Sequence, residues 1–201
     1  MNKFTNILKQ NIESYIMSEN QRMVEWYQEQ LPIMFSDQDF SRFFADSNQN
    51  IMKYSDLSNL SNINEILPSD GYKIILIESQ KNTGHWTCLI RVDDNLIFFD
   101  SYGIYPDNEL NFVSRLTNKL LGNKYATIRD LMKSSNLNLF YSKTKFQKEL
   151  PHIATCGRWC CIAIQMLYQL RYSLGDMKRI LDKQVKRENK PYDLLAVDYT
   201  S

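Results

Sequence analysis

Four residues of this sequence carry the groups that hydrolysis by a thiol requires. Cys156 is the candidate nucleophile, and His85 is the candidate base that accepts its proton. Asp100 would fix the orientation of the imidazole, and Gln147 would donate a side-chain N–H to the oxyanion formed on the attacked carbonyl. Together these groups predict thiolate attack on a carbonyl carbon.

Cys156 stands near the start of an apolar segment, TCGRWCCIAIQMLYQL, which spans residues 155–170. A helix that is apolar on nearly every face is a buried one, so we expect this segment to form the central helix of the domain. The unpaired N–H groups and the dipole at a helix N-terminus lower the pKa of a cysteine located there. Taken alone, Cys156 has an alternative interpretation as a buried structural cysteine.

A predicted β-hairpin brings His85 and Asp100 together. Residues 85–92 and 96–100 are apolar segments separated by a short polar turn. Because the strands of a hairpin are antiparallel, the start of the first strand lies beside the end of the second, which makes His85 and Asp100 neighbours. Taken singly, these residues also have structural explanations, such as a strand cap at His85 and a turn between Asp100 and Gly103.

The remaining apolar patterns predict the elements that surround this hairpin and the central helix. Apolar residues at steps of three and four predict one or two accessory helices within residues 1–30, leaving residues 31–201 as the main domain. The order of elements predicts an α+β fold. We expect a capped helix start at Phe35–Phe44, a loop with one short helix near Leu57 over 45–70, strands over 72–78 and 137–141, helices over 106–121, 125–132 and 176–187, and an irregular tail containing Pro191.

Composition limits the classes of partner and compartment. The chain has 201 residues, with 24 Lys and Arg against 23 Asp and Glu, so its net charge of +1 does not predict binding to nucleic acid. It lacks an apolar run of about 18 residues and a readable secretory signal, so neither a membrane partner nor export is expected. The predicted location is intracellular.

Cysteine and histidine spacing predicts reduced thiols and no metal. The four cysteines at 88, 156, 160 and 161 contain no CxxC motif, and the chain has only two histidines. This pattern fits neither a zinc site nor a disulfide framework. We therefore expect no metal and no cofactor, and we interpret the cysteines other than Cys156 as structural, although a disulfide at Cys88 is left open.

The residues fall into four motifs whose order and approximate spacing match a known family. The motifs are Gly84-His85-Trp86, Phe98-Phe99-Asp100-Ser101-Tyr102-Gly103, Gln147, and Thr155-Cys156-Gly157-Arg158-Trp159-Cys160-Cys161. Over roughly Leu31 to Tyr172, the chain resembles the adenain-like cysteine peptidases, the maturation proteases of adenoviruses and their relatives in other DNA viruses. These share a fold with the SUMO-specific peptidases. The resemblance implies a papain-like α+β fold, in which a mixed sheet packs on a central helix that starts at the nucleophile.

The resemblance also implies roles for individual residues. His85, Asp100 and Cys156 would form the catalytic triad, with Gln147 at the oxyanion hole. Trp86 and Gly157 would bind substrate beside a narrow groove that accepts small residues ahead of the scissile bond. Adenain has Glu where this chain has Asp100, and the interval from Gln147 to Cys156 is slightly longer here. Gln165 is a poor substitute for Gln147, because it lies more than two helical turns beyond Cys156.

The function expected from this resemblance is that of a viral cysteine endopeptidase. It would process polyprotein or capsid and core precursors after small, glycine-type residues, within the virion or the infected-cell cytoplasm. No residue match supports carrying over the activating peptide or the DNA that adenain uses, so an activating peptide remains unknown. Three alternatives stay open: a peptidase that removes a ubiquitin-like modifier, an acetyltransferase that carries the acetyl group on Cys156, and a binding module without activity.

Overall fold

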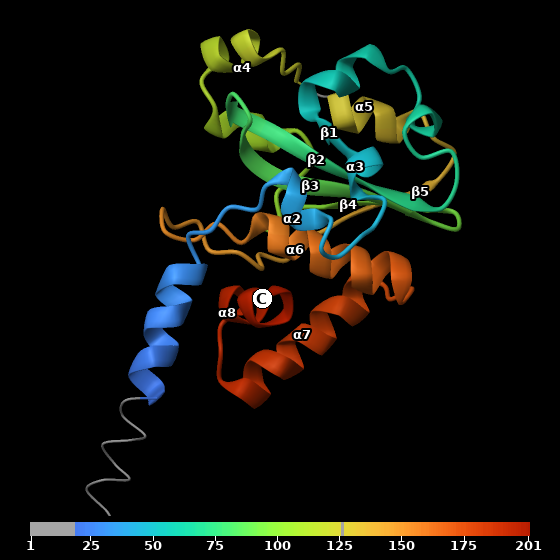
Figure 1. Cartoon of the computed structure of the whole chain (residues 1–201). Coiled ribbons are helices and arrows are strands. Elements are labelled where there is room, and N and C mark those ends of the chain that lie inside the picture. Colours follow the sequence, from blue (N-terminus) through green and yellow to red (C-terminus); the bar gives the residue numbers. More distant parts are fainter. Residues whose placement is uncertain (1–18, 126) are drawn as a thin grey trace, which may run out of the picture.

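A five-stranded mixed sheet forms the centre of the computed structural model, which describes residues 19–125 and 127–201 (Figure 1). The three central strands are antiparallel, and each edge strand runs parallel to its neighbour. The strands lie in chain order, as β1 (Ile51–Lys53), β2 (Gly71–Gln80), β3 (Thr83–Val92), β4 (Asn95–Phe99) and β5 (Asn138–Tyr141). This arrangement confirms the predicted hairpin and the α+β class, while β1 lies in a stretch that the sequence had predicted to be a loop.

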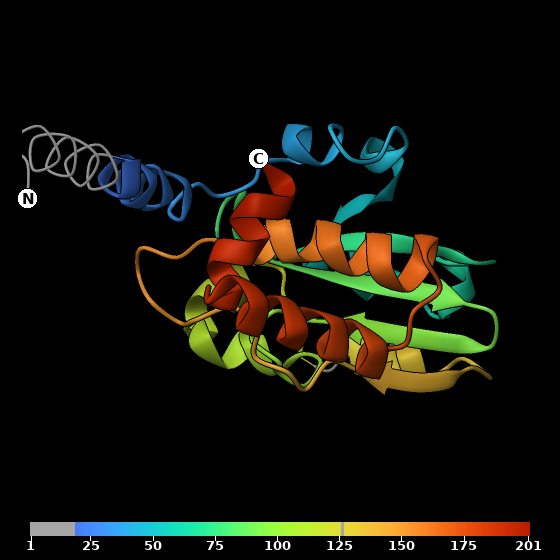
Figure 2. The same ribbon diagram turned by 90° about the horizontal axis from the view of Figure 1, so that it is seen from below.

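Helices cover both faces of the sheet, as Figure 2 shows for the face under α6. On that side, α6 (Cys156–Ala163) continues directly into the π-helical η4 (Ile164–Gln169), with α7 (Leu174–Glu188) and α8 (Tyr192–Thr200) beside them. The predicted central helix is therefore confirmed. The other helical elements are α2 (Asp37–Phe40), α3 (Ser47–Asn50), η1 (Tyr54–Asn59), η2 (Ile63–Glu65), η3 (Asn108–Phe112), α4 (Arg115–Leu121) and α5 (Thr127–Lys133).

Alternation along the strands divides the interior into two cores. Side chains such as Ile74 and Ile90 pack toward α6, whereas Ile75 and Leu89 pack toward η1, η2 and α5 on the opposite face. Because both faces are covered, the strands are apolar at nearly every position instead of alternating with polar residues. The double covering explains the continuous apolar runs in this part of the sequence.

Two glycines permit close approaches that position the start of β3 and of α6. A Cβ atom at Gly84 would lie 2.0 Å from the carbonyl oxygen of Ile77 on the neighbouring strand. A Cβ atom at Gly157 would lie 2.6 Å from the Cβ of Phe35. Both sites therefore require glycine for packing alone.

The predicted helix over 106–121 is wrong, because the segment is divided into η3 and α4. Ser114 begins α4 as its N-cap, accepting a hydrogen bond from the N–H of Thr117. Asn118 then donates to the carbonyl oxygens of Leu110 and Val113 at the end of η3, where the extended backbone of Val113 separates the two helices. As a result, Leu116 and Leu120 are 68% and 78% exposed instead of facing the core. Gly122 ends α4 as its C-cap, with φ of +75° in the left-handed region.

The C-terminal tail is also ordered, contrary to the prediction of an irregular segment. Pro191 is the N-cap of α8, a position where its missing N–H has no consequence. Leu195, Ala196 and Val197 are buried within this helix. The sequence of α8 lacks a clear amphipathic period because this short helix is covered on several sides.

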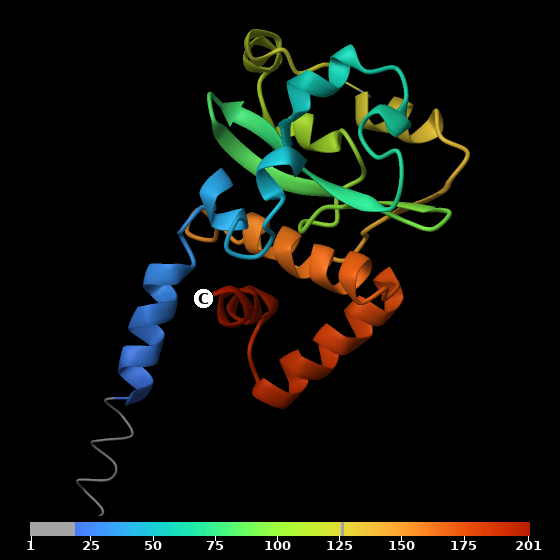
Figure 3. The ribbon, with the colours of Figure 1, turned by 45° about the vertical axis from the view of Figure 1, so that its right-hand side comes forward.

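Residues 19–30 are helical and extend from one end of the molecule, as Figure 3 shows. Tyr27 anchors this helix by donating its hydroxyl to Asp198 of α8 at 2.6 Å. The earlier part of the predicted accessory region, residues 1–18, lies outside the described residues. Among the residues that are described, no helix combines the length and the apolar character needed to cross a membrane.

The close approach at Gly157 predicts that Gly157→Ala destabilises the protein. The added methyl group must push against Phe35, and overpacking of this kind costs about 1–3 kcal/mol in free energy of unfolding. Gly175→Ala is the matched control, since it lies in α7 with ordinary spacing around its Cβ and gains up to about 1 kcal/mol of helix propensity. Denaturant unfolding of both variants tests the prediction, and equal stability would contradict it.

Candidate active site

The structure brings His85, Asp100 and Cys156 together at one rim of the sheet. His85 belongs to β3, Asp100 follows directly after β4, and Cys156 is the first residue of α6. The register of β3 with β4 places the end of one strand beside the start of the other, as predicted. Three segments distant in sequence therefore supply one contiguous set of polar groups.

Asp100 is a fully buried carboxyl group that has donors for both of its oxygens. Its Oδ2 lies 3.1 Å from Nε2 of His85, and its Oδ1 accepts from the backbone N–H of Tyr102 at 2.5 Å. The turn is closed by the N–H of Gly103, which donates to the Asp100 carbonyl and has φ of +71°. This geometry confirms that Asp100 faces His85.

Cys156 completes the set from the N-terminus of the central helix. Its thiol lies beside the His85 ring and the backbone N–H groups of Trp86 and Gly157, which act together to lower the pKa of the thiol. Because Nε2 of His85 is used by Asp100, Nδ1 is the ring nitrogen that remains for the thiol. The residue is 7% exposed, so only a small part of it reaches the surface.

The electrostatics favour a thiolate–imidazolium pair. Burial alone would raise the pKa of Cys156, but the contact with His85 and the two backbone N–H groups outweigh burial and lower this pKa. Burial alone would lower the pKa of His85, but Asp100 and Cys156 outweigh it and raise this pKa well above its usual value. The pKa of Asp100 is lowered because His85 compensates for its burial. The arrangement thus supports the reactive form of sulfur near neutral pH.

Tyr102 belongs to the site but was not singled out from the sequence. Its ring stacks on the His85 imidazole, with centroids 4.6 Å apart and planes inclined by 16°. Its hydroxyl accepts a hydrogen bond from Nε2 of Gln147 at 3.2 Å. The available signal was its place two residues after Asp100, which puts it opposite His85 when the hairpin register is extended.

Gln147 lies in the layer next to the triad instead of bonding to Cys156. It is almost completely buried, and its Nε2 donates to the hydroxyl of Tyr102 and to the carbonyl of Ile153, at 3.2 and 3.1 Å. Its Oε1 accepts from Ser101 at 2.9 Å. Gln147 is thus connected to the site through Tyr102, and its predicted role as an oxyanion donor stays a prediction.

Trp86 and Gly157 both flank Cys156, but each also has a structural role. The Trp86 ring is buried, and its indole N–H donates to the carbonyl of Phe35 at 2.8 Å. Gly157 packs directly against Phe35. Trp86 also borders a hollow of about 630 Å³. This position is compatible with the predicted role of Trp86 in substrate binding. The hollow is lined by Met34, Phe35, Ser36, Asp37, Gln38, Leu76, Asn82, Thr83, Gly84 and Trp86.

Asp193 of α8 fixes the loop that leads into the nucleophile, a role that was not predicted from the sequence. One of its carboxyl oxygens accepts from the hydroxyl of Thr155 at 2.7 Å, and the other accepts from the backbone N–H of Lys148 at 3.1 Å. Thr155 is the N-cap of α6, so this contact holds the helix start in place. The buried tail helix therefore contributes directly to the position of Cys156.

The other three cysteines are buried free thiols, as is Cys156. The reduced state of these cysteines stays a prediction. Burial raises the pKa of Cys160 and of Cys161. These two thiols therefore remain protonated, which distinguishes them from Cys156.

Comparison with known proteins gives one informative relative. No protein-family model matches the chain. "Uncharacterized protein V9" of Sputnik virophage is 34% identical over 137 residues, which cover 66% of this chain and 78% of the virophage protein. The chain belongs to the V9 family. The family has a viral member.

The ion-pair geometry predicts that Cys156 is the fastest thiol to be alkylated. At pH 7, iodoacetamide should modify the tryptic peptide 149–158, which contains Cys156, before the peptide 159–171, which contains the two buried thiols. His85→Ala should slow alkylation of Cys156 on the order of tenfold, because the thiol pKa then rises when only the backbone N–H groups of Trp86 and Gly157 oppose burial.

Mass spectrometry of native protein over a pH series measures both effects. In wild type, the midpoint for Cys156 alkylation should lie below that of a free thiol, and in His85→Ala it should move to higher pH. Equal rates in the two proteins would contradict the pairing of His85 with Cys156.

Proposed function

We propose that this V9-family chain is a cysteine peptidase of the adenain type, with the papain-like form of the α+β fold. The observation that carries the proposal is the contact of the Cys156 thiol with a His85 imidazole whose other nitrogen is held by a buried Asp100. Nucleophile, base and orienting acid in this order constitute the triad of thiol hydrolases. The four motifs that resemble adenain support the same assignment.

The proposed reaction follows from these positions. The Cys156 thiolate attacks the peptide carbonyl, forming a C–S bond and a tetrahedral oxyanion. His85 then transfers its proton to the leaving amine, the C–N bond breaks and a thioester remains. Water, deprotonated by His85, hydrolyses the thioester and restores the thiol. The backbone N–H of Cys156 and the amide of Gln147, which is already linked to Tyr102, are the proposed donors to the oxyanion.

The proposed substrates are viral polyprotein or capsid and core precursors, cut after small residues. Cys156 is nearly buried, so a substrate must present a narrow, extended segment to reach the sulfur. Small residues ahead of the scissile bond suit such access beside the Trp86 ring. The virophage relative supports a viral setting, within the virion or the infected-cell cytoplasm.

The mechanism predicts that Cys156→Ala abolishes cleavage of a Gly-Gly-type peptide or of a candidate precursor. Gln147→Ala should reduce kcat by about 10²–10³, because removing one oxyanion donor has this effect. Both rates would be followed by N-terminal sequencing of the products, which also reports the cleavage site. Circular dichroism confirms that each variant remains folded, and wild-type activity in Cys156→Ala would exclude the mechanism.

A folded ubiquitin-like modifier is a second candidate substrate. The helix over residues 19–30 exposes Met23, Val24 and Trp26, and the nearby Met34 is exposed beside the hollow at Trp86. An apolar surface next to the site suits a protein substrate larger than a short peptide. A ubiquitin or SUMO probe with a thiol-reactive C-terminus should label Cys156 if this candidate is correct. Precursor cleavage without labelling would remove it.

A further inference from the structure

Glu109 is a buried acid in contact with the triad. It lies in η3, is only 4% exposed, and has its carboxyl group beside the buried carboxyl group of Asp100. Neither oxygen of Glu109 receives a hydrogen bond from any donor among residues 19–125 and 127–201. An ionised carboxylate in this position would be buried without a donor, which is costly.

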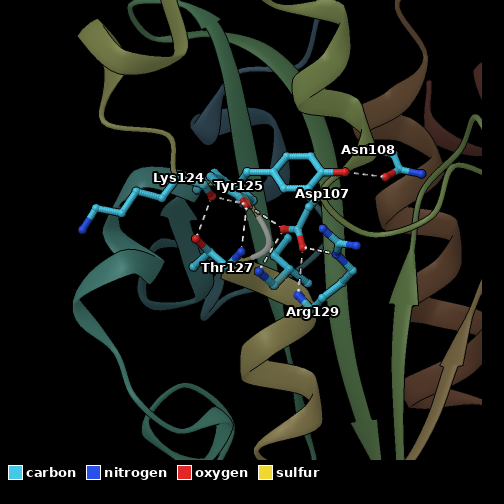
Figure 4. Close-up of polar contacts among 8 residues, drawn as sticks. Asp107, Asn108, Lys124, Tyr125, Thr127 and Arg129 are labelled. Atoms are coloured by element: carbon cyan, nitrogen blue, oxygen red, sulfur yellow. Dashed lines mark hydrogen bonds and ion pairs between the residues drawn. The ribbon is translucent and has the colours of Figure 1, made fainter. Parts of the chain in front are cut away.

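The chain holds Glu109 in this position through its neighbour Asp107. The Asp107 carboxylate is fully buried and accepts four hydrogen bonds, as Figure 4 shows in part. The donors are the Tyr54 hydroxyl at 2.6 Å, the Ile128 N–H at 2.9 Å, and the N–H and Nε of Arg129 at 3.0 and 3.1 Å. These bonds tie the start of η3 to η1 and α5 and so fix the backbone segment that carries Glu109.

The partners of the two carboxyl groups decide which one carries a proton. Asp100 already receives hydrogen bonds from His85 and from the Tyr102 N–H, and these stabilise its ionised form. Glu109 has no comparable donor, and burial together with Asp100 raises its pKa to about 10. The groups that favour ionisation of Glu109 are its own backbone N–H and the His85 imidazole of β3, and burial and Asp100 outweigh both of them.

We propose that Glu109 is a positioning residue, protonated in the folded protein, whose carboxyl O–H donates a hydrogen bond to Asp100 and holds it toward His85. The proton satisfies both acids at once, because it gives Asp100 a third donor and leaves Glu109 neutral in its buried site. The positioning role rests on the proposed function, because it concerns a residue of the proposed triad. The protonation state of Glu109 can be measured without any substrate.

Glu109→Gln tests the protonation state, because the amide keeps the shape and a donor but cannot ionise. In wild type, Glu109 holds its proton when folded and releases it when unfolded above about pH 4.5, so wild-type stability falls as pH rises. The unfolding equilibrium constant of wild type, divided by that of Glu109→Gln, should therefore rise by up to about tenfold per pH unit between roughly pH 5 and 9. Denaturant unfolding at several pH values measures this difference, in which titrations common to both proteins cancel.

Glu149→Gln is the matched control, since it removes an exposed carboxylate that pairs with Lys145 at the surface. Its stability difference from wild type should not grow with pH in the same way. A constant difference between Glu109→Gln and wild type over the pH series would overturn the proposal.

The positioning role is tested by the alkylation rate of Cys156 at fixed pH. Glu109→Leu removes the donor and should slow alkylation about tenfold, the scale of one lost hydrogen bond to a charged group. Glu109→Gln should restore a rate near that of wild type, which a purely space-filling role would not require. Wild-type reactivity in Glu109→Leu would overturn this role. Because neither measurement needs a peptide substrate, failure to find a cleaved peptide would count against the proposed function only.

Discussion

A single buried negative charge, the Asp100 carboxylate, constrains most of the structure around the site. Removing an ion from water costs several kcal/mol unless partners replace the hydration shell. Here the partners come from three directions: the His85 ring on β3, the backbone of the turn at Tyr102, and the acid of η3. Each partner has to be held rigidly, and the surrounding elements can be understood as the means of holding it.

The two carboxyl groups on η3 act differently although they are only two residues apart. Asp107 has four donors and joins three segments. Glu109 has none of this kind and faces another acid. The contrast is one of environment: the donors around Asp107 give it a structural role, and their absence around Glu109 underlies the proposed protonation of Glu109. On the opposite side of the site, Asp193 performs a similar joining task for the loop before α6.

Much of this arrangement could be predicted from the sequence, because it depends on local patterns. The hairpin that aligns His85 with Asp100 follows from two apolar runs and a polar turn, and the central helix follows from an uninterrupted apolar segment. His85 and Asp100 lie side by side because antiparallel pairing brings the start of one strand next to the end of the other.

The features that were missed depend on contacts between distant segments. The break between η3 and α4 is made by Asn118 and Ser114, which would be ordinary polar residues on one long helix. The tail helix α8 gains its stability from burial, which its composition does not reveal. Likewise, the hydrogen bonds of Gln147 with Tyr102 and Ile153 are created by tertiary packing. The sequence predicted that Gln147 lies near the site, but it could not predict these hydrogen bonds.

The location of Cys156 on the helix enclosed by the main core has a consequence for motion. Loops can open and close without disturbing a fold, but α6 cannot leave the sheet unless the apolar layer beneath it comes apart. Fluctuations of the sulfur are therefore coupled to unfolding of the whole domain. The position of Cys156 is therefore fixed, and any flexibility needed for turnover must lie in the substrate and in the surface segments that admit it.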